Sequence, residues 1–440
     1  MSDPAPQPQR ALPLYHRRIE TISPDPGANA LLNRRAAVAG LVAALVATAT
    51  LADTLVQRGS AGLFNDFYDY WLAARVLAAG GNPYDVGALA TTAAHVGLHY
   101  TVGTGYSYPV LFAYLCLPLA ALSASTAAWV FTALSLAGLG VAVALLATPL
   151  ARLRMMELIL LAVLVGGLTP IAGSLYFGQA NLLILPLLAL AYRATARPLA
   201  LGLATAVKLY PAAALAAMAA QGRRSVRLCA ATAAAAAGLT LIPNLVAGKS
   251  STQLTSGLFG PDSFWTNQSI NGWVSRLSMT SEFTHPPLPG LPVVPIELGM
   301  VVLLGAAVLG VMVWRRGSPW EGCISLALLY GIVAAPKNSL WNYTPIVVLL
   351  FYCWPLVRRR PKLLAAFITG LALVEVQVVV DYFRHTFYSG PALTWLSSLA
   401  LYGGLVLMGL NAYLLLTAAD QLPDGVVEPD QAFVAAQEFS

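Results

Sequence analysis

The sequence has few charged residues. Asp, Glu, Lys and Arg together make up 10% of its 440 residues, against about 25% in a typical soluble protein. Hydrophobic residues make up 58%. So few charges cannot cover the surfaces of the two or three water-soluble domains that this length would allow. The composition therefore predicts an integral membrane protein.

The spacing of the cysteines, the missing catalytic motifs and the distribution of charge exclude several kinds of chemistry. The four cysteines lie far apart in apolar runs and form no C-x-x-C pair, so neither a disulfide framework nor a zinc site is expected. The motifs of phosphate-loop nucleotide binding, zinc peptidases and serine hydrolases are absent. The net charge of +6 does not indicate nucleic-acid binding, because the basic residues form short clusters between apolar runs. No cofactor is expected, and a need for a divalent metal stays open.

Long apolar runs dominate the rest of the chain. A bilayer core of about 30 Å needs about 20 apolar residues per helix. The sequence thus predicts an all-α, polytopic membrane protein with about twelve transmembrane helices, near residues 36–56, 106–124, 127–148, 156–172, 178–193, 198–220, 227–247, 293–314, 319–336, 341–357, 363–380 and 393–418. The membrane domain is expected over 36–419, with its first span kept as a signal anchor. The polar tails 1–35 and 420–440 are predicted to be cytoplasmic and disordered.

Clusters of arginine and lysine set the expected orientation. With the N-terminus inside, four clusters fall on the cytoplasmic side, within residues 17–35, 223–227, 315–316 and 358–362. Two pairs disagree, Arg152 with Arg154 and Arg193 with Arg197. Either the spans between 127 and 197 are miscounted, or these arginines contact lipid phosphate. Two long segments, 57–105 and 248–292, are then left outside. Such loops are usually functional, and both are expected to contain short helices.

The first outer segment contains two carboxylates, Asp66 and Asp69, three residues apart. In a helix they share one face, while Phe67 and Trp71 form another that could lie on the membrane surface. Glycines and a turn over residues 80–85 would end this helix. The alternative is structural: Asp66 caps the helix and Asp69 complements the helix dipole.

Polar residues also interrupt two of the apolar runs. Gln179 and Asn181 lie in a break between two runs, and amides at membrane depth must be hydrogen-bonded or face water. The alternative to a ligand contact is a break that caps a helix. Lys208 interrupts a predicted span near its middle, which is costly unless it faces a cavity or an anion. It either binds phosphate or satisfies a backbone carbonyl that Pro211 frees.

Further candidates follow in the second outer segment and beyond it. Asn267, Gln268 and Arg276 combine amide groups with a guanidinium, which suits binding of sugar hydroxyls and phosphate. A solvated loop is the alternative there. At a later outer helix end the candidates are Lys337, Trp341 and Asn342.

In this order and at these separations, the motifs resemble those of the bacterial GT-C glycosyltransferases that depend on polyprenol-phosphate-mannose, the family of the actinobacterial phosphatidylinositol-mannoside α-1,2-mannosyltransferase. The resemblance covers about residues 36–415. It is carried by Asp66 with Tyr70 and Gly81-Asn82-Pro83-Tyr84-Asp85, by Gly178-Gln179-Ala180-Asn181, by Lys208-Leu209-Tyr210-Pro211, and by Asn267-Gln268-Ser269 with Gly272 and Arg276-Leu277. The Asp-x-Asp motif of soluble glycosyltransferases is absent near these loops, which argues against a nucleotide-activated donor.

The resemblance implies a role for each candidate. Asp66 would be the general base that deprotonates an acceptor hydroxyl, with inversion at the anomeric carbon and a lipid-linked phosphate as leaving group. Charge on the departing phosphate would be offset by Lys208, Lys337 and Arg276. The implied substrate contacts are Asp69, Tyr70, Tyr84, Gln179, Asn181, Asn267, Gln268, Trp341 and Asn342. Family members commonly carry histidines where this chain has Pro336–Tyr343, and Lys337 or Asn342 would replace them.

The implied function is that of a hexosyltransferase in the cytoplasmic membrane, with its active site facing outward. It would move a sugar, with mannose favoured, from a polyprenyl-phosphate donor to a glycolipid or cell-envelope glycan. A lipid or sugar transporter or flippase is the alternative. That class should carry intramembrane charge pairs and an internal repeat, and the sequence shows few such charges and no convincing repeat. A non-catalytic scaffold would have no need of Asp66 or Lys208.

Overall fold

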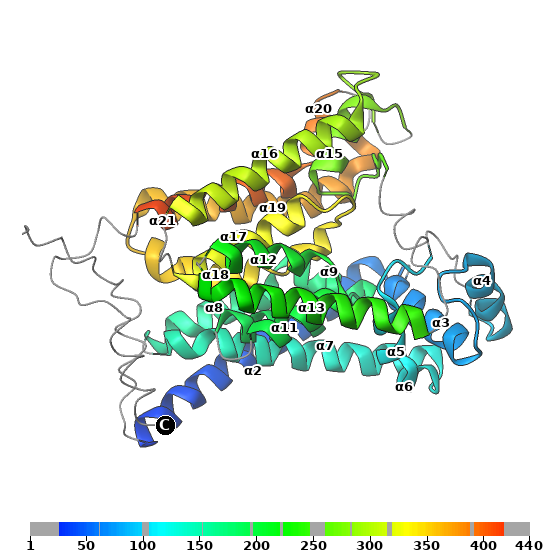
Figure 1. The fold of residues 1–440 in the computed structure, drawn as a ribbon, viewed down its shortest axis with the longest axis horizontal. Helices are drawn as coiled ribbons and strands as arrows, with labels where there is room; N and C mark the ends of the chain where they lie inside the picture. Colours follow the sequence, from blue (N-terminus) through cyan, green and yellow to red (C-terminus); the bar gives the residue numbers. More distant parts are fainter. Residues whose placement is uncertain are drawn as a thin grey trace, which may run out of the picture.

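The chain folds as a bundle of helices (Figure 1). A computed structural model describes residues 26–60, 62–98, 105–151, 153–193, 197–220, 223–246, 260–281, 284–314, 319–387 and 391–417. The described residues form no β-strand, only two isolated bridges, Asn267–Ser339 and Ser281–Thr284. The α-helices are α2 (Pro26–Arg58), α3 (Asn65–Ala78), α4 (Val86–His95), α5 (Val110–Leu115), α6 (Leu117–Ala120), α7 (Ala124–Ala147), α8 (Met155–Gly167), α9 (Thr169–Phe177), α10 (Asn181–Tyr192), α11 (Arg197–Val207), α12 (Ala214–Ala220), α13 (Arg223–Val246), α15 (Ile270–Ser278), α16 (Val293–Trp314), α17 (Trp320–Val333), α18 (Ile346–Val357), α19 (Pro361–Phe387), α20 (Pro391–Leu396) and α21 (Leu399–Thr417). Short 3₁₀ turns cover Thr148–Leu150, Tyr210–Ala213 and Leu340–Tyr343.

Five of the described helices are long and apolar enough to cross a membrane, namely α2, α7, α16, α19 and α21. Helices α8 and α9 together would form a sixth span, bent by 47°. The chain is therefore a multi-pass membrane protein. The predicted count of twelve spans is not confirmed, because several apolar runs are interrupted. The run 106–124 folds as the short helices α5 and α6, and 198–220 folds as α11, a 3₁₀ turn and α12.

The bend between α8 and α9 is stabilised by a carboxylate from another helix. Thr169 follows the bend, and its N–H and Oγ1 both donate to Glu375 of α19, at 3.0 and 2.6 Å. The N–H groups at a helix start have no partner within the helix, and leaving them unpaired in a bilayer is costly. Glu375 satisfies this donor, so α9 can start in a new direction and end at Gly178, beside the candidate site.

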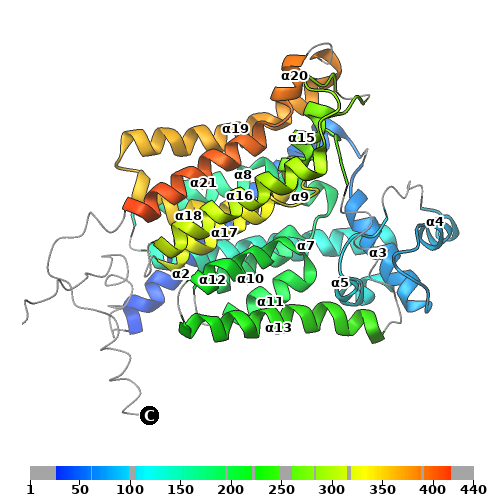
Figure 2. The same ribbon diagram turned by 45° about the horizontal axis from the view of Figure 1, so that its top comes forward.

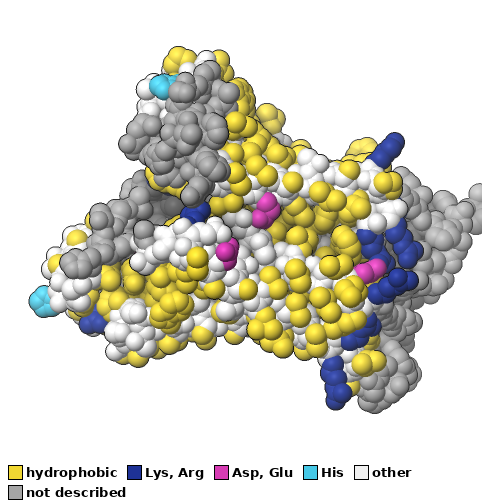
Figure 3. All heavy atoms as spheres, turned by 180° about the vertical axis from the view of Figure 1, so that it is seen from behind, with side chains coloured by type: hydrophobic (Ala, Val, Ile, Leu, Met, Phe, Trp, Pro, Cys, Tyr) yellow, Lys and Arg dark blue, Asp and Glu magenta, His cyan; other side chains and the backbone are white. Residues whose placement is uncertain are grey.

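Basic residues gather at one end of the bundle. Figure 3 shows one face of the molecule, where Lys and Arg side chains are concentrated at one end, next to a broad apolar surface. At this end Arg35 donates to the carbonyl of Leu153 at 2.6 Å, and Arg358 pairs with Glu157. Helices α3 and α4 lie at the opposite end from the start of α2 and the end of α21 (Figures 1 and 2).

This arrangement places one arginine of each pair that disagreed with the predicted orientation. Arg154 adjoins Leu153 and so lies at the same end as Arg35. The indole of Trp320 donates to the carbonyl of Ala191 at 2.8 Å, which places the end of α10, and with it Arg193, beside the start of α17. The run 106–124 was counted as a span but does not cross the bundle, so α7 runs opposite to the predicted direction. Arg152 lies outside the described residues.

Both long segments between membrane helices contain short helices. Helices α3 and α4 lie within 57–105, and α15 lies within 248–292. Helix α2 begins at Pro26, so it starts inside the segment predicted as the N-terminal tail, 1–35. The predicted C-terminal tail, 420–440, lies outside the described residues.

Candidate active site

Asp66 lies in the first turn of α3. Phe64 holds the N-cap position with φ 61° and no side-chain cap, and its N–H donates to the carbonyl of Tyr176 in α9 at 2.9 Å. The structural alternative, in which Asp66 caps this helix, is therefore wrong. Phe67 and Trp71 are buried rather than placed on the membrane surface, and the Trp71 indole donates to the carbonyl of Leu119. Helix α3 is thus fixed against the membrane domain.

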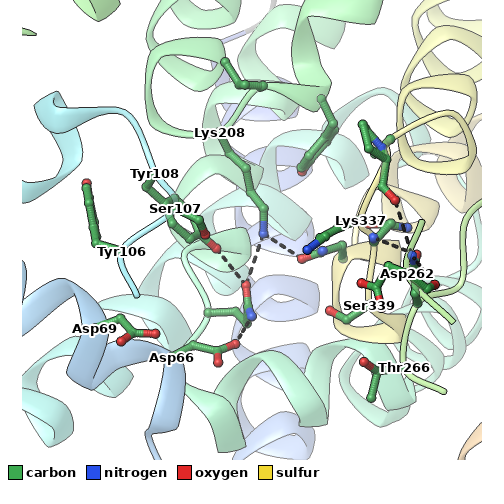
Figure 4. Close-up of a pocket in the computed structure, with 18 of the residues that line it drawn as sticks. Asp66, Asp69, Tyr106, Ser107, Tyr108, Lys208, Asp262, Thr266, Lys337 and Ser339 are labelled. Atoms are coloured by element: carbon green, nitrogen blue, oxygen red, sulfur yellow. Dashed lines mark hydrogen bonds between the residues drawn. The ribbon is translucent and has the colours of Figure 1, made fainter. Parts of the chain in front are cut away.

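A cavity of about 380 Å³ lies beside α3 (Figure 4). This volume is within the usual range of ligand sites, about 300–1,000 Å³. Its walls come from α3, residues 105–109, the breaks between α9 and α10 and between α11 and α12, and two later loops. Eight of the predicted residues line it: Asp66, Asp69, Tyr70, Gln179, Lys208, Asn267, Lys337 and Asn342. Five do not: Tyr84, Asn181, Gln268, Arg276 and Trp341.

Gln179 joins the predicted base to the predicted phosphate-binding cation. Its Nε2 donates to the carboxylate of Asp66, and its Oε1 accepts from Lys208 Nζ at 3.1 Å. Lysine can only donate and an ionised carboxylate can only accept, so the two partners fix the orientation of the amide. One side chain, that of Gln179, therefore holds the carboxylate of Asp66 and the ammonium of Lys208 at a fixed separation.

Lys208 is surrounded by amide oxygens. Its ammonium donates to Gln179 at 3.1 Å, to Asn181 Oδ1 at 2.8 Å and to Asn342 Oδ1 at 2.6 Å. The alternative in which Lys208 satisfies a carbonyl freed by Pro211 is not what the structure shows. All three partners are neutral, and the nearby carboxylate of Asp66 favours the charged form of the ammonium. Burial lowers the pKa of Lys208 from 10.5 to about 7, although the charge of Asp66 raises it, so Lys208 carries its positive charge below about pH 7.

The pKa of Asp66 suits a base that works near neutrality. Burial raises the pKa of Asp66 from 3.8 to about 6, although the charge of Lys208 and the hydrogen bond from Gln179 both lower it. A general base is most effective when its pKa lies close to the working pH. Asp66 is thus mostly ionised at neutral pH and still basic enough to accept a proton.

Gly178 allows this arrangement to form. It ends α9 with φ 70°, in the left-handed region that favours glycine, and directly precedes Gln179. A Cβ at this position would lie 2.5 Å from the Cβ of Phe67 in α3. Without a side chain, the α9–α10 break and α3 approach closely enough for Gln179 to reach Asp66.

Tyr108 and Asp262 also line the cavity and were missed in the sequence. The Tyr108 hydroxyl donates to Gln179 Oε1 at 3.0 Å and accepts from Tyr70 at 2.8 Å. Burial, and then the charge of Asp66, raise the pKa of Tyr108, so its hydroxyl remains a donor. Tyr106 and Tyr108 are polar enough to have indicated a cavity wall, but from the sequence they were assigned to the start of a membrane span.

Three of the predicted residues outside the cavity support its walls. Asn181 is buried, and besides accepting from Lys208 it donates to the carbonyl of Trp341 at 2.8 Å. The Trp341 ring packs 4.8 Å from the ring of Phe177. The Tyr84 hydroxyl donates to the carbonyl of Tyr108 at 3.1 Å. These residues hold the lining groups in place from behind.

Arg276 lies in α15, within the second outer segment, and its side chain has a structural role. Its side chain is fully buried and donates to the carbonyls of Phe264 and Asn267, at 3.0 and 2.8 Å, and to Ser398 Oγ at 2.7 Å. Gln268 is likewise buried and donates to the carbonyl of Ser397 at 2.8 Å. Both side chains fasten the loop to the start of α21 and do not reach the cavity.

Replacing Arg276 by Met is expected to destabilise the protein without changing donor affinity. The change removes the hydrogen bonds from Arg276 to the buried carbonyl of Asn267 and to Ser398 Oγ, and an unpaired buried group costs about 1–3 kcal/mol. The apparent melting temperature in detergent should fall by several degrees, while the donor KM of the folded fraction stays at its original value. A raised donor KM with unchanged melting temperature would instead support phosphate binding by Arg276.

No group of three or more His, Cys, Asp or Glu side chains among the described residues could hold a metal ion.

The comparisons with known proteins identify the family. The model of glycosyltransferase family 87 matches residues 106–336, more than half of the chain. The matched segment contains Gln179, Lys208 and Asp262, while Asp66 precedes it. Searches of curated proteins and of solved structures gave no match. The chain therefore belongs to glycosyltransferase family 87 and is a membrane glycosyltransferase.

Proposed function

We propose that this enzyme transfers a sugar, with mannose favoured, from a polyprenyl-phosphate donor to a glycolipid or cell-envelope glycan, with inversion at the anomeric carbon. The observation that carries the proposal is the chain of contacts Asp66–Gln179–Lys208 along one cavity. It supplies a base and a cation at fixed separation. An inverting transfer needs one well-placed base and a group that stabilises the leaving phosphate.

The bonds change as follows in the proposed reaction. The acceptor hydroxyl attacks the anomeric carbon and its proton passes to the carboxylate of Asp66. The bond between the anomeric carbon and the phosphate oxygen breaks, and the electron pair leaves with the lipid phosphate. Lys208 stabilises the charge that develops on this phosphate. A phosphate is already a good leaving group, so no second carboxyl group is needed to protonate it.

The donor phosphate is assigned to Lys208 because of where this residue lies. Lys208 follows the apolar helix α11 at its break with α12. The next residue, Leu209, lines the same cavity and is 44% exposed on the surface of the chain. A lipid tail could therefore leave the cavity past Leu209 into the bilayer. Lys337 is exposed at the cavity and is proposed as a second phosphate contact. Arg276 is left out, because its guanidinium is used within the protein.

The site is proposed to face away from the cytoplasm. Basic residues gather at the end of the bundle opposite α3 and α4 (Figures 1 and 3). Positively charged loops are retained on the cytoplasmic side of bacterial membranes. The cavity beside α3 then opens on the outer face of the cytoplasmic membrane. A polyprenyl-phosphate donor suits a site on the outer face, because a membrane lipid carries its sugar to the enzyme.

A reconstituted assay tests the proposal. Full-length protein in lipid nanodiscs is incubated with polyprenyl-phosphate-[³H]mannose and a bacterial glycolipid extract, and the products are separated and analysed by mass spectrometry and NMR. Transfer with an inverted anomeric centre is expected. Transfer from a nucleotide sugar but not from the lipid donor would contradict the donor class. Movement of labelled lipid across the bilayer without transfer would favour the flippase.

The pH dependence follows from the raised pKa of Asp66. The base must be ionised to accept a proton, so kcat/KM should fall as the pH drops through about 6. The rate should fall again as the pH rises through about 7, because burial lowers the pKa of Lys208 to about 7 and a neutral Lys208 cannot stabilise the phosphate. With an unperturbed carboxylate the fall would begin near pH 4. Initial rates measured between pH 4.5 and 8 at subsaturating donor check this; an unchanged rate at pH 5 would contradict the assignment of Asp66 as the base.

A further inference from the structure

We propose that Asp262, Thr266 and Ser339 bind hydroxyl groups of the acceptor's own sugar ring. The inference rests on the proposed function and deepens it: the acceptor is recognised as a carbohydrate at a defined wall of the cavity, here called the Asp262 wall. These residues lie on the far side of the cavity from Asp66 and Asp69 (Figure 4).

Several polar groups of the Asp262 wall make no hydrogen bond to the other residues that the structure describes. Asp262 Oδ1 accepts from the N–H of Phe264 at 3.0 Å, whereas Oδ2 has no hydrogen-bond partner in the part of the chain that the structure describes. The hydroxyls of Thr266 and Ser339 likewise make no hydrogen bond to other described residues, although both line the cavity. One carboxylate oxygen and two hydroxyls thus face the same space. Neighbouring Asn267, by contrast, is fully engaged: its Oδ1 accepts from Ser269 Oγ and from the N–H of Asn338, at 2.7 and 3.1 Å.

The backbone that carries these groups is held rigidly. The N–H of Asp262 donates to Asn271 Oδ1 at 3.1 Å and to Ser275 Oγ at 3.0 Å, both in α15. Ser339 is bridged to Asn267. A binding group is most effective when its neighbours fix it before the ligand arrives. The second outer segment therefore presents a preformed set of donors and acceptors.

The chemistry of the wall selects a neutral polyhydroxyl ligand. A carboxylate accepts hydrogen bonds from sugar hydroxyls, and serine and threonine hydroxyls both donate and accept. The same carboxylate repels a phosphate, so the Asp262 wall does not suit the anionic part of the donor. That part has Lys208 on another wall. The ring of an acceptor sugar then lies between Asp66, which deprotonates one of its hydroxyls, and Asp262, which holds others.

Steady-state kinetics with both substrates varied test this inference. The full-length protein in nanodiscs is assayed with polyprenyl-phosphate-[³H]mannose and hexyl α-mannoside as the acceptor probe. Asp262→Asn keeps an oxygen for the Phe264 N–H and is expected to raise the acceptor KM by about ten- to a hundredfold, the loss expected for hydrogen bonds to a charged group. The donor KM should not change. Thr266→Val and Ser339→Ala should raise the acceptor KM by smaller factors. Ser263→Ala, in the same loop but not lining the cavity, is the matched control.

A binding measurement keeps this inference separate from the proposed reaction. Saturation-transfer NMR of hexyl α-mannoside, with hexanol as comparison, is recorded on the wild-type protein without donor. A mannoside signal that is lost in Asp262→Asn supports the inference, even if transfer from the lipid donor is never observed. In the kinetics of Asp262→Asn, a higher donor KM with an unchanged acceptor KM would overturn the inference, because the Asp262 wall would then bind the donor's sugar. Equal signals from both probes, or an unchanged acceptor KM in Asp262→Asn, would overturn it as well.

Discussion

Replacing Asp66 by Asn is expected to lower kcat by about 10²–10⁴-fold, the usual effect of losing a general base. Asn keeps the size of the side chain and an oxygen for the hydrogen bond from Gln179, but it cannot accept a proton. Helix α3 should keep its place, because Phe67 and Trp71 anchor it. The turnover of the reconstituted enzyme at saturating donor and acceptor measures the effect. The pH dependence near 6 should disappear in the same variant.

Asp69→Asn is the matched comparison. Asp69 lies one turn along α3 and lines the same cavity. Gln179 donates to Asp66, and Asp66 therefore has the contact that couples it to Lys208. The loss in Asp69→Asn should be much smaller. If Asp69→Asn removed activity and Asp66→Asn did not, the site would stand with the base assigned to the wrong carboxylate. Full activity in both variants would falsify the proposed mechanism.

Replacing Lys208 by Gln is expected to lower kcat by about 10²–10³-fold, as is usual when one group that stabilises transition-state charge is lost. Glutamine removes the charge but still has two N–H groups for the amide oxygens that surround Lys208. The fold should therefore survive, which an unchanged melting temperature would verify. Turnover and donor KM are measured in the same nanodisc assay.

Two further variants separate charge from local structure. Lys362→Gln changes an exposed lysine at the start of α19, and it should leave turnover at the wild-type value. Lys208→Arg keeps the charge but not the shape of an ammonium, and it should retain more activity than Lys208→Gln. Equal turnover in Lys208→Gln and the wild type would remove Lys208 from the reaction and leave it a purely structural role.

The residues that the sequence identified best are polar groups in apolar surroundings. Lys208 and Gln179 interrupt runs in which a polar side chain is costly, and the structure brings both to the cavity with Asp66. That inference is local, because it needs only the neighbours in the chain. Asp262 was missed because it sits in a polar segment, where a carboxylate needs no explanation. Only the fold of α15, which holds its backbone, brings it to the cavity.

The errors in the fold have a different cause. Hydropathy measures how apolar a run is, and it does not show whether the helix crosses the bilayer or ends inside the bundle. Residues 106–124 are apolar enough for a span, yet Tyr106 and Tyr108 belong to the cavity and α5 has only six residues. Arg276 shows the same limit for a side chain. Its type suits phosphate binding, but its hydrogen bonds to carbonyls depend on contacts that the sequence does not display.

The ammonium of Lys208 has a consequence for turnover. With the proposed donor, the bound phosphodiester carries one negative charge, and the polyprenyl phosphate left after transfer carries up to two, because the second pKa of a phosphate monoester is about 6. Three neutral amide oxygens do not reduce the attraction between this phosphate and the ammonium. The spent lipid carrier therefore binds more tightly than the donor. With that donor, we expect added polyprenyl phosphate to inhibit the enzyme.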